Sequence, residues 1–336
     1  MTMSLDELDR MIGDYIFEKG AFFFEELALF IHTYQFNYNS FYRGFCVAQK
    51  IPEYLTSWQD IPFFPIESFK GSIVPSVDSL LSLEGMWFET SGTSIGEKTR
   101  VYRDSGYFKL RSLTIIKQGE QNWFHRFNGQ KIKIIFIDKA NRRNQESFKF
   151  EYSVLNNIMQ FFGRDDSVFC NHKEDFHQIV DAIVTAAKNR DPLVIIGPTY
   201  YFSYLIERIK NTRISIPYNE RLLIMDSGGL KGKGYHNSIA EYRADLFATF
   251  KLNTYNYKNT YAMTEMGSQV SDTDVGWKEI PRWMRLRLVD DKGRFDVPKG
   301  KIVVFDLLNR ANLFGILTND IACYDHGKLI IEGRSL

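Results

Sequence analysis

The stretch richest in groups that could do chemistry is 88–100, with the sequence Phe-Glu-Thr-Ser-Gly-Thr-Ser-Ile-Gly-Glu-Lys-Thr-Arg. Its hydroxyl groups and unhindered backbone N–H groups can surround phosphate oxygens. Gly92 and Gly96 permit the backbone angles that this needs, and Lys98 and Arg100 add positive charge. The stretch matches neither a Walker A loop nor a Gly-x-Gly-x-x-Gly turn. Taken alone it is also typical of a solvated turn, so we expect a different kind of phosphate loop or none.

Three further stretches carry side chains that could take part in chemistry. They are 224–234 (Ile-Met-Asp-Ser-Gly-Gly-Leu-Lys-Gly-Lys-Gly), 261–268 (Tyr-Ala-Met-Thr-Glu-Met-Gly-Ser) and 317–320 (Leu-Thr-Asn-Asp). The first is a Gly-rich turn, the second sets an aromatic ring beside a hydroxyl and a carboxylate, and the third ends in a carboxylate. A ring can stack on a base, hydroxyls can donate to phosphate, and a carboxylate can bind Mg²⁺ or accept from a ribose. Together the stretches predict nucleotide binding.

The elements that must position these groups alternate along most of the chain. Apolar spacing predicts helices over 4–18, 22–34, 37–50, 150–162, 173–189, 199–211 and 236–250, with one more beginning at Ser105. Short apolar runs predict strands at 86–89, 131–137, 193–197 and 222–225. A strand, a Gly-rich turn and the helix from Ser105 would suit an anion. Continuous apolar strands between helices favour a buried, largely parallel sheet.

Past Arg285 the pattern changes to short strands divided by turns, which predicts a mostly antiparallel region. The fold class is therefore α/β, with layered sheets, flanking helices and a β-rich C-terminal subdomain. Ser4 followed by Glu7 is typical of a capping box at the start of the first helix. The aromatic excess of 15% could line an apolar channel, but aromatic packing between helices is the preferred interpretation.

Composition and charge exclude several classes of function. Apolar residues make up 44%, charged residues 25%, and the net charge is +1, so neither nucleic acid nor an anionic membrane is an expected partner. No apolar run approaches the roughly 20 residues of a membrane span. Three cysteines without metal or disulfide spacing, and an acidic N-terminus without a signal peptide, indicate a cytoplasmic protein. The histidines indicate neither a metal site nor a Ser-His-Asp order, and His32 is expected at the surface.

In this combination and order, the four motifs resemble those of the adenylate-forming ligases. The resemblance is strongest to the acyl-protein synthetase branch of bacterial luciferase systems, with phenylacetate-CoA ligases as more distant relatives. It covers roughly residues 50 to 336. It implies the fold of the family's N-terminal domain and three regions: a helical region over 1–50, an α/β adenylating core over 51–280, and a β-rich subdomain over 281–336 that ends at the family's hinge.

The resemblance also implies which residues bind the nucleotide. The phosphate loop that holds the β and γ phosphates of ATP corresponds to Thr90, Ser91, Gly92, Thr93, Ser94 and Lys98. The turn that lines the adenine and acyl pocket corresponds to Ser227, Gly228 and Gly229. Tyr261 matches the ring that stacks on adenine, and Asp320 matches the aspartate that binds the ribose hydroxyls.

The residues implied to act in catalysis are Lys98, Thr264, Glu265 and Arg334. Thr264 would touch the α phosphate, Glu265 would hold Mg²⁺, and Arg334 matches the arginine of the hinge Gly-Arg. The implied reaction is ATP-dependent activation of a fatty or aryl carboxylic acid to acyl-AMP. Transfer of the acyl group to a thiol acceptor would follow, with CoA, a carrier protein or a reductase partner as the acceptor.

Two departures from the family pattern keep alternatives open. Thr318-Asn319-Asp320 stands where the family usually has Thr-Gly-Asp or Thr-Glu-Asp. The sequence stops at the hinge, so the small domain with the family's catalytic lysine and acyl-carrying cysteine is not represented, and Cys323 is expected to be a structural thiol. A non-catalytic nucleotide or acyl-adenylate binding module, or a subunit of a fatty-acid reductase complex, are the alternative functions.

Overall fold

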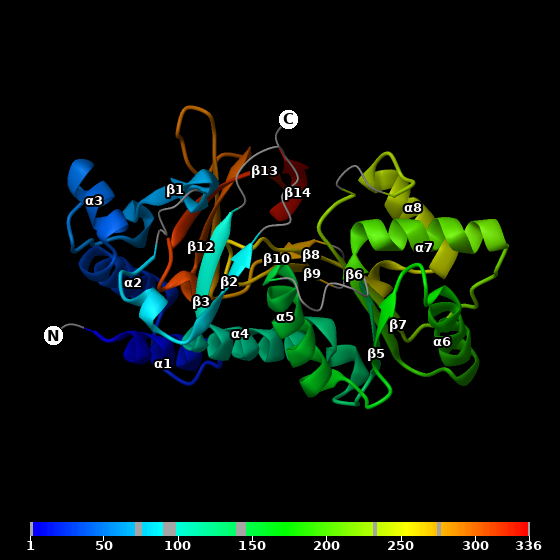
Figure 1. Cartoon of the computed structure of the whole chain (residues 1–336). Coiled ribbons are helices and arrows are strands. Elements are labelled where there is room, and N and C mark those ends of the chain that lie inside the picture. Colours follow the sequence, from blue (N-terminus) through cyan, green and yellow to red (C-terminus); the bar gives the residue numbers. More distant parts are fainter. Residues whose placement is uncertain are drawn as a thin grey trace. The chain divides into compact units, whose positions relative to one another are not determined.

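The computed structural model describes residues 3–70, 76–89, 99–138, 146–230, 234–273 and 277–334 (Figure 1). The chain forms two compact units. The first contains Met1–Lys117, Met263–Gln269 and Ile280–Leu336, and the second contains Gln118–Ala262 and Val270–Glu279. The predicted division of the sequence at residues 50 and 280 into three regions stays a prediction.

Helices open the first unit, as the apolar spacing predicts. They are α1 (Leu5–Ile16), α2 (Phe24–Tyr38), α3 (Ser40–Ala48) and α4 (Ser105–Gln118). The Glu7 N–H donates to Ser4 Oγ at 3.2 Å, which caps the start of α1. The N-terminal helices and the helix that begins at Ser105 are therefore confirmed.

The sheet of the first unit is antiparallel in the order β11 (Met284–Val289), β12 (Lys299–Asp306), β13 (Gly315–Asp325) and β14 (Lys328–Arg334). This confirms the antiparallel C-terminal region. One parallel strand, β1 (Phe63–Pro65), joins the sheet beside β13. A separate hairpin pairs β2 (Gly85–Glu89) with β3 (Arg100–Asp104). The sequence did not predict β3, which separates the Gly-rich stretch from α4.

Aromatic side chains pack inside the first unit. Tyr42 and Cys46 of α3 form one cluster with Phe64 of β1 and Ile316 of β13. This favours aromatic packing as the use of the aromatic excess. The expectation that His32 lies at the surface is wrong, because its side chain is fully buried. Both ring nitrogens have partners there: Nδ1 lies 2.7 Å from Tyr42 Oη, and Nε2 lies 2.9 Å from the Pro52 carbonyl oxygen.

The second unit contains the parallel sheet that the sequence predicts. Its strands run in the order β5 (Val168–Asn171), β4 (Lys133–Asp138), β6 (Leu193–Pro198), β7 (Leu222–Ser227) and β8 (Tyr257–Tyr261). Two short antiparallel strands, β9 (Val270–Asp272) and β10 (Lys278–Glu279), follow β8. The helices are α5 (Glu146–Phe162), α6 (Phe176–Asn189), α7 (Thr199–Thr212) and α8 (Ile239–Phe250).

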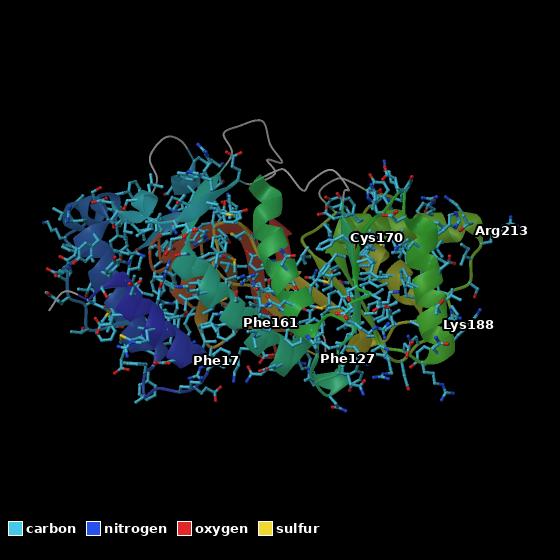
Figure 2. The ribbon with its side chains drawn as sticks, turned by 60° about the horizontal axis from the view of Figure 1, so that its bottom comes forward. Phe17, Phe127, Phe161, Cys170, Lys188 and Arg213 are labelled. Atoms are coloured by element: carbon cyan, nitrogen blue, oxygen red, sulfur yellow. The ribbon has the colours of Figure 1, made fainter. Side chains whose placement is uncertain are left out.

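Alternate side chains of these strands are buried on both faces of the parallel sheet. On one face, Ile135, Ile195 and Ile224 pack in a single core with side chains of α6, α7 and α8. On the other face, Val194 and Leu223 are also fully buried. This explains the continuous apolar runs in the sequence. Figure 2 labels Lys188 near the end of α6 and Arg213 at the end of α7.

Short helical turns connect the longer elements. They are Trp58–Asp60, Ile66–Phe69, Leu80–Ser82, Gly119–Trp123, His125–Phe127, Thr254–Asn256 and Leu307–Asn309. In the part of the chain that the structure describes, no helix combines the length and apolar character needed to cross a membrane.

Candidate active site

Two of the predicted motifs meet at the carboxyl edge of the parallel sheet. Ser227 ends β7 and pairs in register with Thr260 of β8, so Tyr261 lies one residue further along the same edge. Gly228 follows Ser227 in a left-handed conformation, with φ 73°, which glycine adopts readily. Ligands of open α/β sheets bind beyond the carboxyl ends of the strands. The structure therefore brings the Ser-Gly-Gly turn and the strand that carries Tyr261 together at the carboxyl edge of the sheet.

The N-terminus of α7 holds this turn. The Thr199 hydroxyl is buried and donates to the carbonyl oxygens of Ser227 at 3.1 Å and Gly228 at 3.0 Å. A hydroxyl shared between two carbonyls fixes the direction of the peptide groups on either side of Gly228. The sequence analysis missed Thr199. The available signal was a Gly-Pro-Thr step between a predicted strand and a predicted helix.

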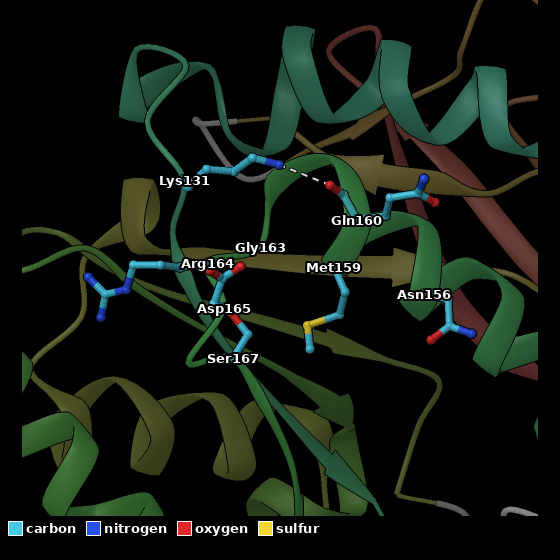
Figure 3. Close-up of a pocket in the computed structure, with 8 residues that line it drawn as sticks. All are labelled: Lys131, Asn156, Met159, Gln160, Gly163, Arg164, Asp165 and Ser167. Carbon is cyan, nitrogen blue, oxygen red and sulfur yellow. Dashed lines mark hydrogen bonds between the residues drawn. The ribbon is translucent and has the colours of Figure 1, made fainter.

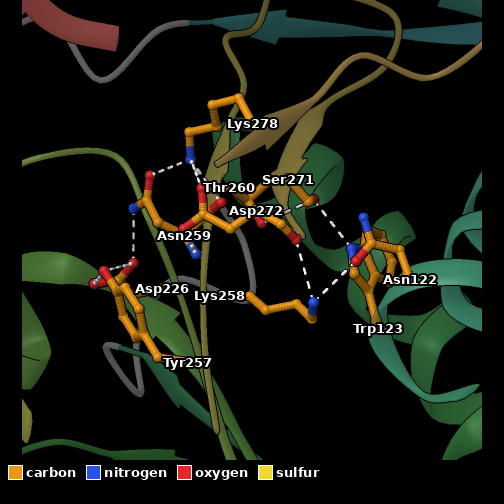
Figure 4. Close-up of polar contacts among 10 residues, drawn as sticks. All are labelled: Asn122, Trp123, Asp226, Tyr257, Lys258, Asn259, Thr260, Ser271, Asp272 and Lys278. Atoms are coloured by element: carbon orange, nitrogen blue, oxygen red, sulfur yellow. Dashed lines mark hydrogen bonds and ion pairs between the residues drawn. The ribbon is translucent and has the colours of Figure 1, made fainter. Parts of the chain in front are cut away.

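A buried carboxylate lies directly before the turn. Asp226 accepts hydrogen bonds from Tyr242 Oη at 2.6 Å, Tyr257 Oη at 3.0 Å and Asn259 Nδ2 at 2.7 Å (Figure 4 shows Tyr257 and Asn259 beside it). Burial raises the pKa of the Asp226 carboxyl, although the hydrogen bonds from its three partners act in the opposite direction. The network ties β7 to both α8 and β8, and so fixes the backbone from which Ser227 extends.

An ion pair braces β8 from its other side. Lys278 Nζ lies 2.9 Å from Asp272 Oδ1, and it donates to the carbonyl oxygen of Asn259 at 2.8 Å (Figure 4). Burial lowers the pKa of the Lys278 ammonium, and the nearby Asp272 carboxylate opposes that shift. Lys258 Nζ donates to the Asp272 carbonyl oxygen at 3.2 Å. Tyr261 therefore ends a strand whose neighbours are tied to it by buried polar contacts.

In the first unit, a buried guanidinium holds the segment that carries Thr264 and Glu265. Arg103 donates to the carbonyl oxygens of Thr264 at 3.1 Å and Glu265 at 3.0 Å. Asn309 Nδ2 also donates to the Glu265 carbonyl oxygen, at 3.1 Å, and Arg103 donates to Asn309 Oδ1 at 2.8 Å. The Glu265 side chain is 2% exposed and that of Thr264 is partly exposed. The backbone under both predicted catalytic side chains is thus fixed on its carbonyl side.

The next residues of this segment are fixed as well. Tyr107 Oη donates to the Gly267 carbonyl oxygen at 3.2 Å. Asp306 accepts from the Ser268 N–H at 2.6 Å and from the Ser268 hydroxyl at 3.0 Å. A side chain at Gly267 would place its Cβ 2.5 Å from Leu308 Cβ, so only glycine fits there. Sequence reasoning missed these supports because they come from residues more than 30 positions away.

The structure pairs the backbones of the two predicted residues nearest the C-terminus. Asp320 of β13 lies opposite Arg334 of β14 in the antiparallel register. The Asp320 N–H donates to Thr318 Oγ1 at 3.2 Å, and the Thr318 hydroxyl donates to the Ile302 carbonyl oxygen at 3.1 Å. Thr318 therefore orients the backbone at Asp320. The side chain of Arg334 lies outside the described residues.

The predicted phosphate loop is not described. Thr90, Ser91, Gly92, Thr93, Ser94 and Lys98 all lie outside the described residues. On either side of them, Glu89 of β2 pairs with Arg100 of β3, whose Nε lies 3.0 Å from Glu89 Oε1. The expectation that the Gly-rich stretch leads directly into the helix at Ser105 is wrong, because β3 comes between them.

Magnesium binding at Glu265 stays a prediction. The described residues contain no group of three or more His, Cys, Asp or Glu side chains arranged to hold a metal ion. Mg²⁺ bound with a nucleotide commonly takes one or two carboxylates and completes its shell with phosphate oxygens and water. A single carboxylate at Glu265 fits that mode, in which the phosphates would supply the remaining ligands.

A hollow of about 710 Å³ lies elsewhere in the second unit (Figure 3). Its lining includes Lys131, Gly163 and Ser167, which precede β4 and β5, so it opens at the amino ends of the parallel strands. Lys131 Nζ donates to the Gln160 carbonyl oxygen at 2.9 Å and so caps the end of α5. The hollow is at the opposite edge of the sheet from Ser227 and is not the candidate site.

No known protein-family model matches the chain. Two curated proteins are similar to it, and both are named long-chain-fatty-acid–luciferin-component ligase. The protein of Aliivibrio fischeri is 23% identical over 328 residues, which cover 94% of this chain and 84% of the relative. The protein of Vibrio harveyi is 23% identical over 276 residues, which cover 80% of this chain and 70% of the relative.

Solved structures similar to this chain include several adenylate-forming enzymes. One is an open conformation of 2-hydroxyisobutyryl-CoA ligase in complex with 2-HIB-AMP and CoA, with a TM-score of 0.66 and 14% identity, covering 99% of this chain and 76% of that one. Another is the McyG A-PCP structure with phenylalanyl-adenylate, with a TM-score of 0.52 and 13% identity, covering 87% and 47%. The resemblance drawn from the motifs is confirmed: this chain has the adenylate-forming ligase fold and is similar in sequence to the long-chain-fatty-acid–luciferin-component ligases.

Proposed function

We propose that the protein activates a carboxylic acid with ATP to form acyl-AMP and then passes the acyl group to a thiol. The observation that carries the proposal is the placement of the Ser-Gly-Gly turn and Tyr261 on neighbouring strands at the carboxyl edge of the parallel sheet. Thr264 and Glu265 follow Tyr261 within four residues, on a segment whose carbonyl groups are held by Arg103. The similarity to ligases along 94% of the chain supports the same reaction.

The chemistry needs charge neutralisation and alignment more than covalent catalysis. An oxygen of the acid attacks the α phosphorus of ATP, the bond from that phosphorus to the bridging oxygen breaks, and pyrophosphate leaves. Because the carboxylate and the triphosphate repel each other, the protein must hold both and offset their charge. In this proposal Tyr261 stacks on adenine, Asp320 accepts from the ribose hydroxyls, and the Thr264 hydroxyl donates to the α phosphate. Mg²⁺ at Glu265 supplies positive charge when it is bound.

We place a long-chain fatty acid first among the acid substrates. The support is the name of the two curated relatives, which are ligases of long-chain fatty acids. The thiol acceptor is CoA, a carrier protein or a reductase partner; CoA is present in the similar 2-hydroxyisobutyryl-CoA ligase structure. We further place the protein in the cytoplasm, because all three cysteines are free thiols.

Direct detection of acyl-AMP tests this proposal. The protein is incubated with ATP, Mg²⁺ and one carboxylic acid at a time. The small-molecule products are then separated and identified by mass spectrometry. We expect an acyl-AMP with a long-chain acid.

In parallel, calorimetry of the Lys98→Ala variant should show a larger loss of affinity for ATP than for AMP, because only ATP carries the β and γ phosphates. Equal losses for both nucleotides would contradict the phosphate-loop assignment.

A further inference from the structure

Three polar side chains form a continuous hydrogen-bonded chain in the second unit. His236 Nδ1 lies 2.6 Å from Ser203 Oγ, and His236 Nε2 lies 3.0 Å from Asp245 Oδ2. Ser203 belongs to α7, Asp245 belongs to α8, and His236 lies between β7 and α8. We call these three residues the His236 bridge. The expectation that the histidines take part in no Ser-His-Asp order is wrong, because these three residues follow one another in that order along the chain and are hydrogen-bonded.

The His236 bridge is not arranged as a hydrolytic triad. The Ser203 side chain is fully buried within α7, where a substrate carbonyl has no access to it. Its Oγ also accepts a hydrogen bond from the Tyr235 N–H at 2.9 Å. Asp245 is shared with Lys210 of α7, which forms an ion pair with the same Oδ2. A nucleophilic serine needs an exposed Oγ and a free site for the developing oxyanion, so we assign the group a different role.

Counting donors and acceptors gives the bridge a direction. The Asp245 carboxylate can only accept, so His236 Nε2 carries a proton and donates to it. With a neutral imidazole, Nδ1 then accepts from the Ser203 hydroxyl. The Ser203 oxygen in turn accepts from the Tyr235 N–H. Every donor in this row of hydrogen bonds has an acceptor, and the row ends at the backbone N–H of Tyr235.

One face of α7 contacts the chain at two places between β7 and α8, first just after β7 and again at Tyr235. Thr199 and Ser203 are four residues apart, so they lie one above the other on α7. Thr199 binds the carbonyl oxygens of Ser227 and Gly228, and Ser203 binds the N–H of Tyr235. At Gly234, where φ is 90°, an added Cβ would lie 2.5 Å from Ser203 Oγ. The backbone therefore approaches this helix as closely as a glycine allows.

We propose that Ser203, His236 and Asp245 are positioning residues that set the affinity of the Ser227–Gly229 turn for the adenylate. This inference rests on the proposed function of that turn. The bridge has no reacting atom of its own and acts through the backbone of residues 234–236. Loss of the bridge weakens binding of the substrate and the transition state alike, which raises KM for ATP and leaves kcat nearly unchanged.

Hydrogen exchange and steady-state kinetics on the full chain test the role of the bridge. Ser203→Ala removes both of the serine's contacts, and Asp245→Asn alters the partly exposed end of the bridge, where misfolding is not expected. We expect faster exchange of the Tyr235 amide in Ser203→Ala, by about tenfold or more, and a KM for ATP about five- to tenfold higher, as loss of one net hydrogen bond gives. The kcat should stay within about twofold of the wild type. Thr212→Ala, an exposed hydroxyl at the end of the same helix, is the matched control and should change neither quantity.

Substitution of the histidine gives a second, independent arm. An Asn side chain can present an acceptor near the position of Nδ1, so His236→Asn should keep the Ser203 contact and a KM closer to the wild type than His236→Ala. Unchanged exchange at Tyr235 in Ser203→Ala would overturn the anchoring role. Faster exchange with an unchanged KM for ATP would overturn the link to the nucleotide. A wild-type protein that binds no ATP would overturn the proposed function and this role with it, while the exchange arm would still report on the anchor.

Discussion

Glu265 carries its carboxylate on a backbone that is fixed by two side chains from elsewhere in the first unit. Its carbonyl oxygen accepts from both Arg103 and Asn309. A substitution that changes the charge of this side chain therefore leaves both hydrogen bonds to the carbonyl oxygen in place. Function and fold can therefore be separated at this residue by a substitution of equal size.

The first prediction at this scale is that Glu265→Gln loses Mg²⁺-dependent formation of acyl-AMP. We expect a fall in kcat of about 100-fold or more, because the neutral amide is a much poorer ligand for a hard cation. Thermal unfolding should change little, since the carbonyl contacts of residue 265 remain. Glu174→Gln, at an exposed position in the second unit, is the control. A Glu265→Gln enzyme with wild-type turnover across a magnesium titration would contradict the assignment.

The second prediction concerns the aromatic ring of Tyr261. Tyr261→Ala should weaken ATP binding by about 1–2 kcal/mol, roughly the value of one base stacked on an aromatic ring. Tyr261→Phe keeps the ring and should bind ATP within about twofold of the wild type. Calorimetric titration of both variants with ATP measures this. Equal weakening by Phe and Ala would show that the hydroxyl, and not the ring, carries the interaction.

Whether a site residue can be found from the sequence depends on how clearly the helix or strand that carries it shows in the apolar pattern. Ser227 was predictable as the end of a strand, because the run Leu-Leu-Ile-Met before it is apolar. The strand that ends at Tyr261 was not predicted, because its sequence, Tyr-Lys-Asn-Thr-Tyr, is not an apolar run. Arg103 was not predictable, since it lies in β3, a strand of mixed polarity with the sequence Arg-Val-Tyr-Arg-Asp. His32 was assigned to the surface because helical spacing does not show that Tyr42 and Pro52 will reach it. Such partners are brought together only by folding.

Arg103→Met tests the support of the Thr264–Glu265 segment. The substitution leaves the carbonyl oxygen of Thr264 and the side-chain oxygen of Asn309 without the donor that they have in the wild type, which should cost about 1–3 kcal/mol in the free energy of unfolding. Chemical denaturation measures this cost. Arg43→Met, at an exposed arginine of α3, should cost less than about 0.5 kcal/mol. A similar small effect at both positions would contradict the role given to Arg103.

The buried His32 predicts a pH dependence of stability. Burial lowers the pKa of its imidazole below the ordinary value of 6.5, and the Pro52 carbonyl and Glu53 oppose this shift only in part. Since the unfolded chain takes up the proton first, the stability contributed by neutral His32 is complete above about pH 6.5 and falls as the pH drops toward the folded-state pKa. The melting temperature should therefore decline between pH 7 and 5.

Replacement of the histidine isolates this contribution. His32→Gln should show a shallower decline of the melting temperature over the same pH range, on top of a lower starting value. The exposed His326 serves as the comparison, because His326→Gln should leave the slope as it is in the wild type. An identical slope in wild type and His32→Gln would contradict the assignment of the titration to His32.

Across the whole molecule, the class of fold followed from patterns that need no tertiary information. Buried parallel strands read as continuous apolar runs, and the C-terminal antiparallel strands read as short runs between turns. The two compact units did not follow, because each is assembled from segments far apart in the sequence. For example, residues 263–269 leave the second unit and belong to the first. Contacts such as those of Asp306 with Ser268 decide that membership.

Acid-dependent exchange of labelled pyrophosphate into ATP, measured on the wild-type chain with Mg²⁺, tests directly whether the protein forms acyl-AMP. This exchange reports the reversible formation of acyl-AMP and needs no knowledge of the thiol acceptor. We predict exchange that depends on a long-chain fatty acid and is weaker with short or aromatic acids. The absence of exchange with every class of acid, in a protein that binds ATP, would contradict the proposed adenylation.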